Sequence, residues 1–200
     1  MSIDQLTALA IANRWEVLAV ITGIISVYLS TRENIWSWPT ALVNVALYFV
    51  VFYEAKLYAD MGLQAVYFAL SLYGWYEWLY GGENRTELHV SRTPRALGLR
   101  LAIIGVVCAV VLGTLLARLT DAALPYIDSA TTSTSLVAQW MMTRKILENW
   151  AVWVAVDVVY IAMFIFKRLY LTAGLYAVFL VLAVMGYVQW KRSLVARSLA

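Results

Sequence analysis

The sequence predicts an all-α integral membrane protein in which seven transmembrane helices form two parallel three-helix repeats joined by one linker helix, a 3+1+3 arrangement. Three observations lead to this prediction. The 200-residue chain is 63% hydrophobic and only 14% charged, whereas soluble domains are nearer half apolar and a quarter charged. Several apolar runs are long enough to cross a bilayer. The chain also repeats itself at a fixed offset.

Six runs have the roughly 17–25 mainly apolar residues that a helical span requires. They cover 15–31, 36–54, 60–80, 96–118, 150–166 and 170–190. A seventh stretch, 127–143, is rich in serine and threonine. Its hydropathy alone would leave it as a loop.

The internal repeat predicts that 127–143 is also a helix. When the sequence is shifted by 112 residues, 38–78 aligns with 150–190 without a gap, and Thr31-Arg32 aligns with Thr143-Arg144. Chance would not readily place so many aromatic and glycine pairs in one register. The identical pairs include Trp38/Trp150, Tyr48/Tyr160, Phe52/Phe164, Leu57/Leu169, Tyr58/Tyr170, Gly62/Gly174, Leu63/Leu175, Gly74/Gly186 and Trp78/Trp190. The repeat unit therefore has three helices, and its second copy requires 127–143.

Because a single span separates the two triples, both enter the membrane in the same direction, as in SWEET-like carriers. The small polar residues of 127–143 then serve close packing and interhelical hydrogen bonds, and we expect this helix to be shielded from lipid. The paired glycines Gly74 and Gly186 indicate close helix packing, with a hinge as the alternative. The predicted segments are an N-terminal segment (1–14), the first repeat (15–80), a hinge loop (81–95), the linker helix (96–118), a loop (119–126), the second repeat (127–190) and a C-terminal tail (191–200).

Lysine and arginine predict the orientation, because they are enriched in cytoplasmic loops. Ten of them fall on one side if the N-terminus is outside and the C-terminus is cytoplasmic, against five on the other side. Residues 1–14 lack a basic region and a cleavage site, so no signal peptide is expected. The single cysteine, Cys108, excludes a disulfide framework and a metal-type cluster, and the single histidine, His89, lies in a polar loop. Nucleotide-binding, zinc-protease and triad motifs are absent, so we predict neither an enzyme, nor a metal or cofactor, nor a nucleic-acid partner.

Polar and aromatic residues recur at helical spacing inside three spans. Gln64, Tyr67, Ser71, Trp75 and Trp78 share one face of 60–80. The segment 150–166 repeats the pattern with Trp150, Trp153, Asp157, Tyr160 and Phe164, and 36–54 adds Ala41, Asn44, Tyr48 and Phe52. Trp38, near the start of 36–54, is a further candidate for substrate binding. These stripes predict a polar cavity lined by rings, on which flat aromatic ligands stack and cations gain about 0.5–2 kcal/mol.

Other interpretations remain open for these residues. Trp36, Trp38, Trp78, Trp150 and Trp190 lie near span ends, where tryptophans form interfacial belts. Tyrosines and amides inside spans also tie helices together. Asp157 is the hardest to explain structurally, since an aspartate at mid-helix costs about 2.5–3.5 kcal/mol and usually faces a cavity or a partner. No lysine or arginine lies at its depth, so it is predicted to meet a cationic ligand or a proton.

Two stretches carry a resemblance to a known family. The motifs "LYAD..LQ" and "YGWY.W" within 34–78, and "TRK..ENW..W" within 142–190, resemble the Pnu family of bacterial vitamin transporters over nearly the whole chain. The resemblance implies a full-length SWEET-like fold, a homotrimer in the inner membrane, and facilitated diffusion of an unphosphorylated vitamin that a separate kinase traps. It also implies hydrogen bonding to substrate by Gln64, a ring-stacking wall from Trp150 and Trp153, and a polar position at Asn44.

The resemblance and the residues together favour nicotinamide riboside, whose pyridinium ring is a flat cation. Thiamine, or another aromatic vitamin, is the alternative. Family members that carry the riboside often have asparagine where this chain has Asp157. A proton-coupled carrier using Asp157, and a scaffold that transports nothing, are hypotheses of a different class.

Overall fold

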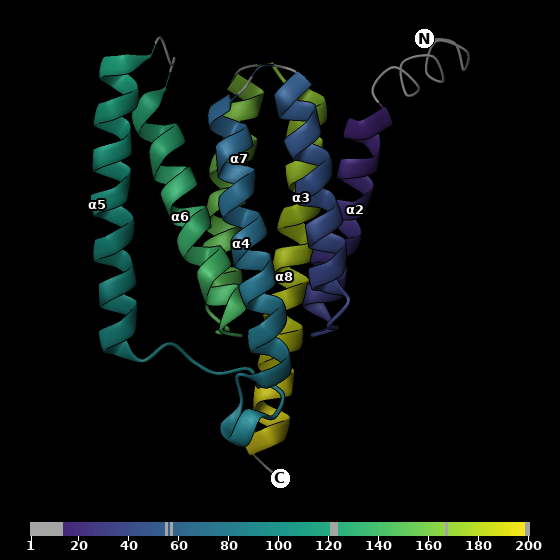
Figure 1. Cartoon of the computed structure of the whole chain (residues 1–200). Coiled ribbons are helices and arrows are strands. Elements are labelled where there is room, and N and C mark those ends of the chain that lie inside the picture. The colour runs from purple at the N-terminus through teal and green to yellow at the C-terminus, as the bar shows by residue number, and fades with distance from the viewer. Residues whose placement is uncertain (1–13, 55, 57, 121–123, 167, 199–200) are drawn as a thin grey trace.

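The computed structural model describes residues 14–54, 56, 58–120, 124–166 and 168–198, and it is all-helical apart from one isolated bridge. Within these described residues seven α-helices follow one another, labelled as in Figure 1. They are α2 (Arg14–Thr31), α3 (Ser37–Glu54), α4 (Tyr58–Tyr80), α5 (Arg95–Leu119), α6 (Pro125–Thr143), α7 (Asn149–Phe166) and α8 (Tyr170–Ser198). A short 3-10 helix, Glu83–Arg85, follows α4. The predicted N-terminal segment lies almost wholly outside the described residues.

The helices lie where the sequence predicts them, with one clear difference. The polar stretch 127–143 is helical within α6. By length and composition alone, α2, α5, α7 and α8 are apolar enough to cross a membrane. The last helix is longer than its predicted span of 170–190, because α8 continues through most of the predicted C-terminal tail to Ser198. Residues 191–198 contain no glycine or proline and several good helix formers, so nothing ends the helix at the edge of its apolar run.

The turns between helices repeat at the same offset as the sequence. Glu33 (φ 54°), after α2, and Lys145 (φ 47°), after α6, both have left-handed backbones. Lys56 (φ 58°), after α3, and Arg168 (φ 60°), after α7, form a second such pair. Each pair is 112 residues apart. A left-handed residue other than glycine is uncommon, so two matched pairs show that both triples turn in the same way.

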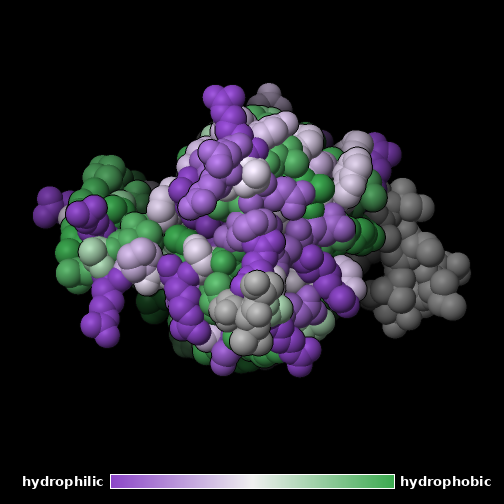
Figure 2. Space-filling model, turned by 90° about the horizontal axis from the view of Figure 1, so that it is seen from below, coloured by the Kyte–Doolittle hydropathy of each residue, from purple (hydrophilic) through white to green (hydrophobic). Residues whose placement is uncertain are grey.

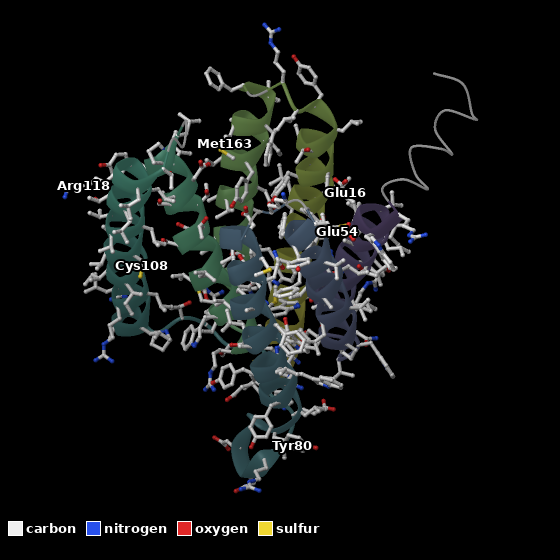
Figure 3. All side chains as sticks on the ribbon, turned by 45° about the horizontal axis from the view of Figure 1, so that its top comes forward. Glu16, Glu54, Tyr80, Cys108, Arg118 and Met163 are labelled. Atoms are coloured by element: carbon white, nitrogen blue, oxygen red, sulfur yellow. The ribbon has the colours of Figure 1, made fainter. Side chains whose placement is uncertain are left out.

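The two triples pack against each other through equivalent helices. Within them, α3 lies against α2 and α4, and α7 lies against α6 and α8. Between them, α2 contacts α8 and α4 contacts α6, so the first helix of each triple meets the third helix of the other. The linker α5 packs against α6 at one side of the molecule (Figure 1). Its outward residues are exposed and apolar, and Cys108 also points outward (Figure 3).

The small polar residues of α6 are buried, as the repeat predicts. Ser129, Thr131, Ser133 and Ser135 are each at most 5% exposed. The hydroxyl groups of Ser129 and Thr131 donate to backbone carbonyls one turn earlier in α6. Such bonds satisfy a hydroxyl inside its own helix, while the small side chains let neighbouring helices approach.

The loop 81–94 is hydrogen-bonded to the second triple, and its role as a hinge stays a prediction. The Ser91 N–H donates to the Lys145 carbonyl, and the Leu147 N–H donates back to Ser91, which forms a parallel bridge. The backbone N–H and the hydroxyl of Thr93 both donate to Glu148 Oε2, at 2.9 and 2.8 Å. These bonds attach the loop to the turn between α6 and α7.

Gly74 and Gly186 lie directly against tryptophan rings. A Cβ added at Gly74 would come within 2.2 Å of the Trp38 ring, and one at Gly186 within 2.5 Å of the Trp150 ring. Packing therefore explains both glycines. Gly62 and Gly174, another pair related by the repeat, have no atom within 4 Å of such a Cβ.

We expect Gly74→Ala and Gly186→Ala each to destabilise the protein by about 1–3 kcal/mol, the usual cost of overpacking. Gly62→Ala and Gly174→Ala are matched controls, expected to be neutral or to stabilise by up to about 1 kcal/mol. Thermal unfolding of the purified protein in detergent measures the difference. Equal unfolding midpoints for all four variants would show that the rings move aside freely.

Candidate functional site

A cavity of about 580 Å³ lies between the two triples. It is lined by α2, α3, α4, α6, α7 and α8, while α5 stays outside it. All ten residues that the sequence singles out as substrate-binding line this one space: Trp38, Asn44, Tyr48, Gln64, Tyr67, Ser71, Trp150, Trp153, Asp157 and Tyr160. The structure thus brings together side chains from three separate stripes. Their role in binding stays a prediction.

Aromatic rings form much of the wall in repeated pairs. Tyr48 stacks on Phe52, with ring centroids 5.6 Å apart, and Tyr160 stacks on Phe164 at 5.8 Å. Tyr176 of α8 lies 4.7 Å from Tyr160. Ring faces carry partial negative charge, so this wall favours a flat or cationic ligand.

The charged residues that line the cavity are all acidic. Asp157 is only 4% exposed and lies in the middle of α7. The other charged lining residue is Glu16, and no lysine, arginine or histidine lines the cavity in the described part of the chain. In the repeat register Asp157 corresponds to Val45, so the carboxylate has no counterpart in the first triple. The two charged lining residues, one on α2 and one on α7, are therefore both acidic.

Polar side chains supply the remaining hydrogen-bonding groups. The Asn44 side-chain amide donates to the backbone carbonyl of Ala19 in α2, and both residues line the cavity. Ser71 is 1% exposed, while Gln64 and Tyr67 are half-buried. These groups match the needs of a ligand with hydroxyl or amide groups.

Sequence reasoning missed several lining residues. Gln139 and Ser135 of α6, and Tyr176 and Phe179 of α8, also line the cavity. The repeat held a signal for two of them, because Tyr176 corresponds to Gln64 and Phe179 corresponds to Tyr67. Trp75 and Trp78, by contrast, belong to the predicted stripe but do not line the cavity.

Two lining tryptophans, Trp38 and Trp150, close one end of the cavity, and two further tryptophans pack against them. Trp38, Trp78, Trp150 and Trp190, here the tryptophan cluster, are at most 3% exposed, so the interfacial belt is wrong for all four, whereas Trp36 is 65% exposed. Trp38 meets Trp78 edge to face at 5.3 Å, and Trp150 meets Trp190 in the same way at 5.4 Å. Trp78 and Trp190, whose centroids are 5.9 Å apart, join the two halves.

Hydrogen bonds tie this closed end together across the two triples. The Trp78 indole donates to the Met142 carbonyl at 3.1 Å, and the Trp190 indole donates to the Ser30 carbonyl at 3.0 Å. The two bonds correspond under the repeat, and each joins one triple to the other.

An ion pair lies beside the tryptophan cluster. Lys145 Nζ is 3.4 Å from Glu33 Oε2 and 4.5 Å from the centre of the Trp78 ring. Burial lowers the pKa of the Lys145 ammonium, and the nearby Glu33 carboxylate opposes that shift. Glu33 and Lys145 occupy equivalent positions in the two repeats. The turn after α2 therefore contacts the equivalent turn after α6. A second pair, Arg144–Glu77 at 2.6 Å, joins α4 to the turn after α6.

The opposite end of the cavity is its open end. It is lined by Glu16 in the first turn of α2, by Phe52 and Phe164 near the ends of α3 and α7, and by Thr172 near the start of α8. Figure 3 shows Glu16 at this end. None of these four is buried. The closed end faces the viewer in Figure 2, where hydrophilic side chains spread across the centre and hydrophobic ones lie over α5.

An apolar exterior and an internal cavity open at one end are features that membrane transporters share. The family model described as "Nicotinamide mononucleotide transporter" matches residues 13–192. The chain is a member of this family.

Its relatives include vitamin carriers of more than one specificity. The nicotinamide riboside transporter PnuC of Escherichia coli is 29% identical, over 89% of this chain and 85% of the relative. PnuC of Neisseria mucosa is 31% identical, over 88% and 71%. The riboflavin/roseoflavin transporter RibM of Streptomyces davaonensis is 28% identical, over 85% and 81%. A crystal structure of the vitamin B3 transporter PnuC matches with a TM-score of 0.72 and 27% identity, covering 94% of this chain and 85% of that one.

Proposed function

We propose that this protein takes up unphosphorylated nicotinamide riboside across a bacterial cytoplasmic membrane by facilitated diffusion, with a separate kinase trapping the product. The observation that carries the proposal is the pairing of Asp157 with the tryptophan wall of Trp150 and Trp153 in one cavity. A pyridinium ring gains both from an aromatic face and from a nearby carboxylate. The names of the PnuC relatives support the same substrate.

The unphosphorylated form follows from the charges of the cavity. A phosphate group is normally held by arginine, lysine or several backbone amides. The lining offers no basic side chain in the described residues, and its two carboxylates would repel a phosphate. The mononucleotide in the family's description is therefore disfavoured as the substrate of this chain.

The proposed architecture is seven spans in a SWEET-like 3+1+3 arrangement, with parallel repeats around an axis along the membrane normal. The matched turns, the reciprocal indole bonds and the equivalent Glu33 and Lys145 support it. The basic residues of the closed end favour a cytoplasmic location for that end, which leaves the open end outside. Transport then requires the closed end to open while the other end closes. A homotrimer rests on the family resemblance.

Two alternatives share this site. Thiamine carries a thiazolium ring and meets the same wall, and RibM makes riboflavin a further candidate among aromatic vitamins. Coupling to protons through Asp157 is the alternative mechanism. Uptake into proteoliposomes with and without a pH gradient separates it, because facilitated diffusion is insensitive to the gradient.

Binding of nicotinamide riboside is expected to quench tryptophan fluorescence, because the ligand stacks beside Trp150 and Trp153. Trp153→Phe keeps a ring and should weaken binding less than Trp153→Ala, which is expected to lose about 0.5–2 kcal/mol. Trp36→Ala is the matched control, since Trp36 is 65% exposed and lies outside the cavity. Titration with nicotinamide riboside, thiamine, riboflavin and nicotinamide measures these effects. Unchanged affinity in Trp153→Ala would place the ligand elsewhere.

A further inference from the structure

Glu16 is a charged residue that lines the cavity, and the proposed function assigns it no role in binding the substrate. It lies in the first turn of α2, is exposed, and lines the open end. Neither of the two ion pairs in the described residues includes Glu16. The guanidinium of Arg14 lies instead over the Trp15 ring, 5.2 Å from its centre. The carboxylate thus stands at the entrance without a neutralising partner among the described side chains.

Among the described residues, the others that line the entrance are uncharged. Phe52, Phe164 and Thr172 line it beside Glu16, and the next carboxylate inward is Asp157. A ligand that enters therefore meets one negative charge at the mouth, then a wall of tyrosines and phenylalanines, and then a second negative charge. Low-dielectric walls concentrate the field of such charges and raise the local concentration of ions of opposite sign.

We propose that Glu16 is a specificity-determining residue that recruits cationic aromatic solutes to the open end and disfavours neutral and anionic ones. This inference rests on the proposed function of the cavity as a substrate path. Glu16 acts on entry, because it lies at the surface and not beside the tryptophan wall. Asp157 and that wall then hold the cation deeper in the molecule.

The test compares a cationic substrate with a neutral one of nearly the same shape. Nicotinamide riboside carries a charged ring, whereas its dihydro form has the same ribose and carboxamide on an uncharged ring. Initial uptake into proteoliposomes is measured for both, at low and high ionic strength, in the wild type and in Glu16→Gln. Glu54→Gln is the control, because Glu54 is exposed at the end of α3 at the same end of the molecule (Figure 3) but does not line the cavity.

For the cation, Glu16→Gln is expected to raise KM about three- to tenfold with kcat unchanged, and to remove most of the dependence of KM on salt. The dihydro form should show the same KM in both proteins, and Glu54→Gln should behave as the wild type. An unchanged KM for the cation in Glu16→Gln, or an equal rise for both substrates, would overturn the inference.

Binding of nicotinamide riboside by the wild type tests the proposed function independently of Glu16. If the wild type binds no nicotinamide riboside, that function is wrong. Thiamine and riboflavin then serve as the cationic and neutral pair, and the ratio of Glu16→Gln to wild type for each still tests the role of Glu16.

Discussion

Asp157→Asn is expected to lower kcat/KM for nicotinamide riboside about 10- to 150-fold. The change keeps the size of the side chain and removes its charge. Interactions with a charged group are worth about 1.5–3 kcal/mol, and Asp157 is 4% exposed, so water screens its charge weakly. Uptake into proteoliposomes, together with Kd from fluorescence titration, measures the loss.

The matched control is Asp60→Asn, since Asp60 is an exposed aspartate of α4 that does not line the cavity. Neutral riboflavin provides a second control, because its binding gains nothing from a carboxylate countercharge. If Asp157→Asn binds the pyridinium as tightly as the wild type does, the cation is not neutralised at this position. Loss of sensitivity to a pH gradient in Asp157→Asn, where the wild type is sensitive, would instead identify a proton-coupled carrier.

The second large effect is expected at the closed end. Glu33→Gln leaves the Lys145 ammonium, whose side chain is 8% exposed, without its carboxylate partner. Leaving a charged group unpaired and buried costs about 1–3 kcal/mol or more, and the closed end should therefore open more often. Lys145→Met is expected to be milder, because the remaining Glu33 side chain is 24% exposed and reaches water. Uptake should fall in both variants, and further in Glu33→Gln.

The repeat offers an unusual control for this pair. Glu33 and Lys145 occupy equivalent turns with the same left-handed backbone, so the double variant Glu33→Lys, Lys145→Glu rebuilds the pair with its charges exchanged. It should recover most of the uptake. The readout of opening is labelling of Ser37→Cys, a buried lining position, by an impermeant maleimide in a Cys108→Ser background. Labelling from the closed side should rise about tenfold in Glu33→Gln and return toward wild type in the exchange variant. Equal labelling in all variants would show that the pair does not hold this end closed.

Much of the helical layout could be predicted from residue order alone, because its determinants are local or periodic. Apolar runs marked six helices, and the repeat marked 127–143, whose polar side chains are largely buried against other helices. The end of α8 was missed because hydropathy reports the edge of an apolar run and not the end of a helix. The anchored loop was missed because its bonds from Ser91 and Thr93 join segments more than 50 residues apart.

The residues of the site could likewise be predicted only in part. Helical spacing collected Trp153, Asp157 and Gln64 because residues of one stripe share a face. Spacing does not show how deep a residue lies or what faces it from another helix. Trp78 continues the stripe of Gln64 but lies in the tryptophan cluster, and Gln139 faces the cavity from a helix whose sequence shows mainly small polar residues.

The reciprocal indole bonds also bear on how the protein is made. Met142 lies 64 residues after Trp78, and Trp190 lies 160 residues after Ser30. Contacts between such distant residues form late, since the chain between them must first be in place. Trp190 belongs to α8, so a nascent chain that has not yet reached α8 lacks the bond from Trp190 to Ser30. The pair of bonds across the two triples is therefore completed only after α8 has been synthesised, and a chain cut before α8 would keep at most the bond from Trp78 to Met142.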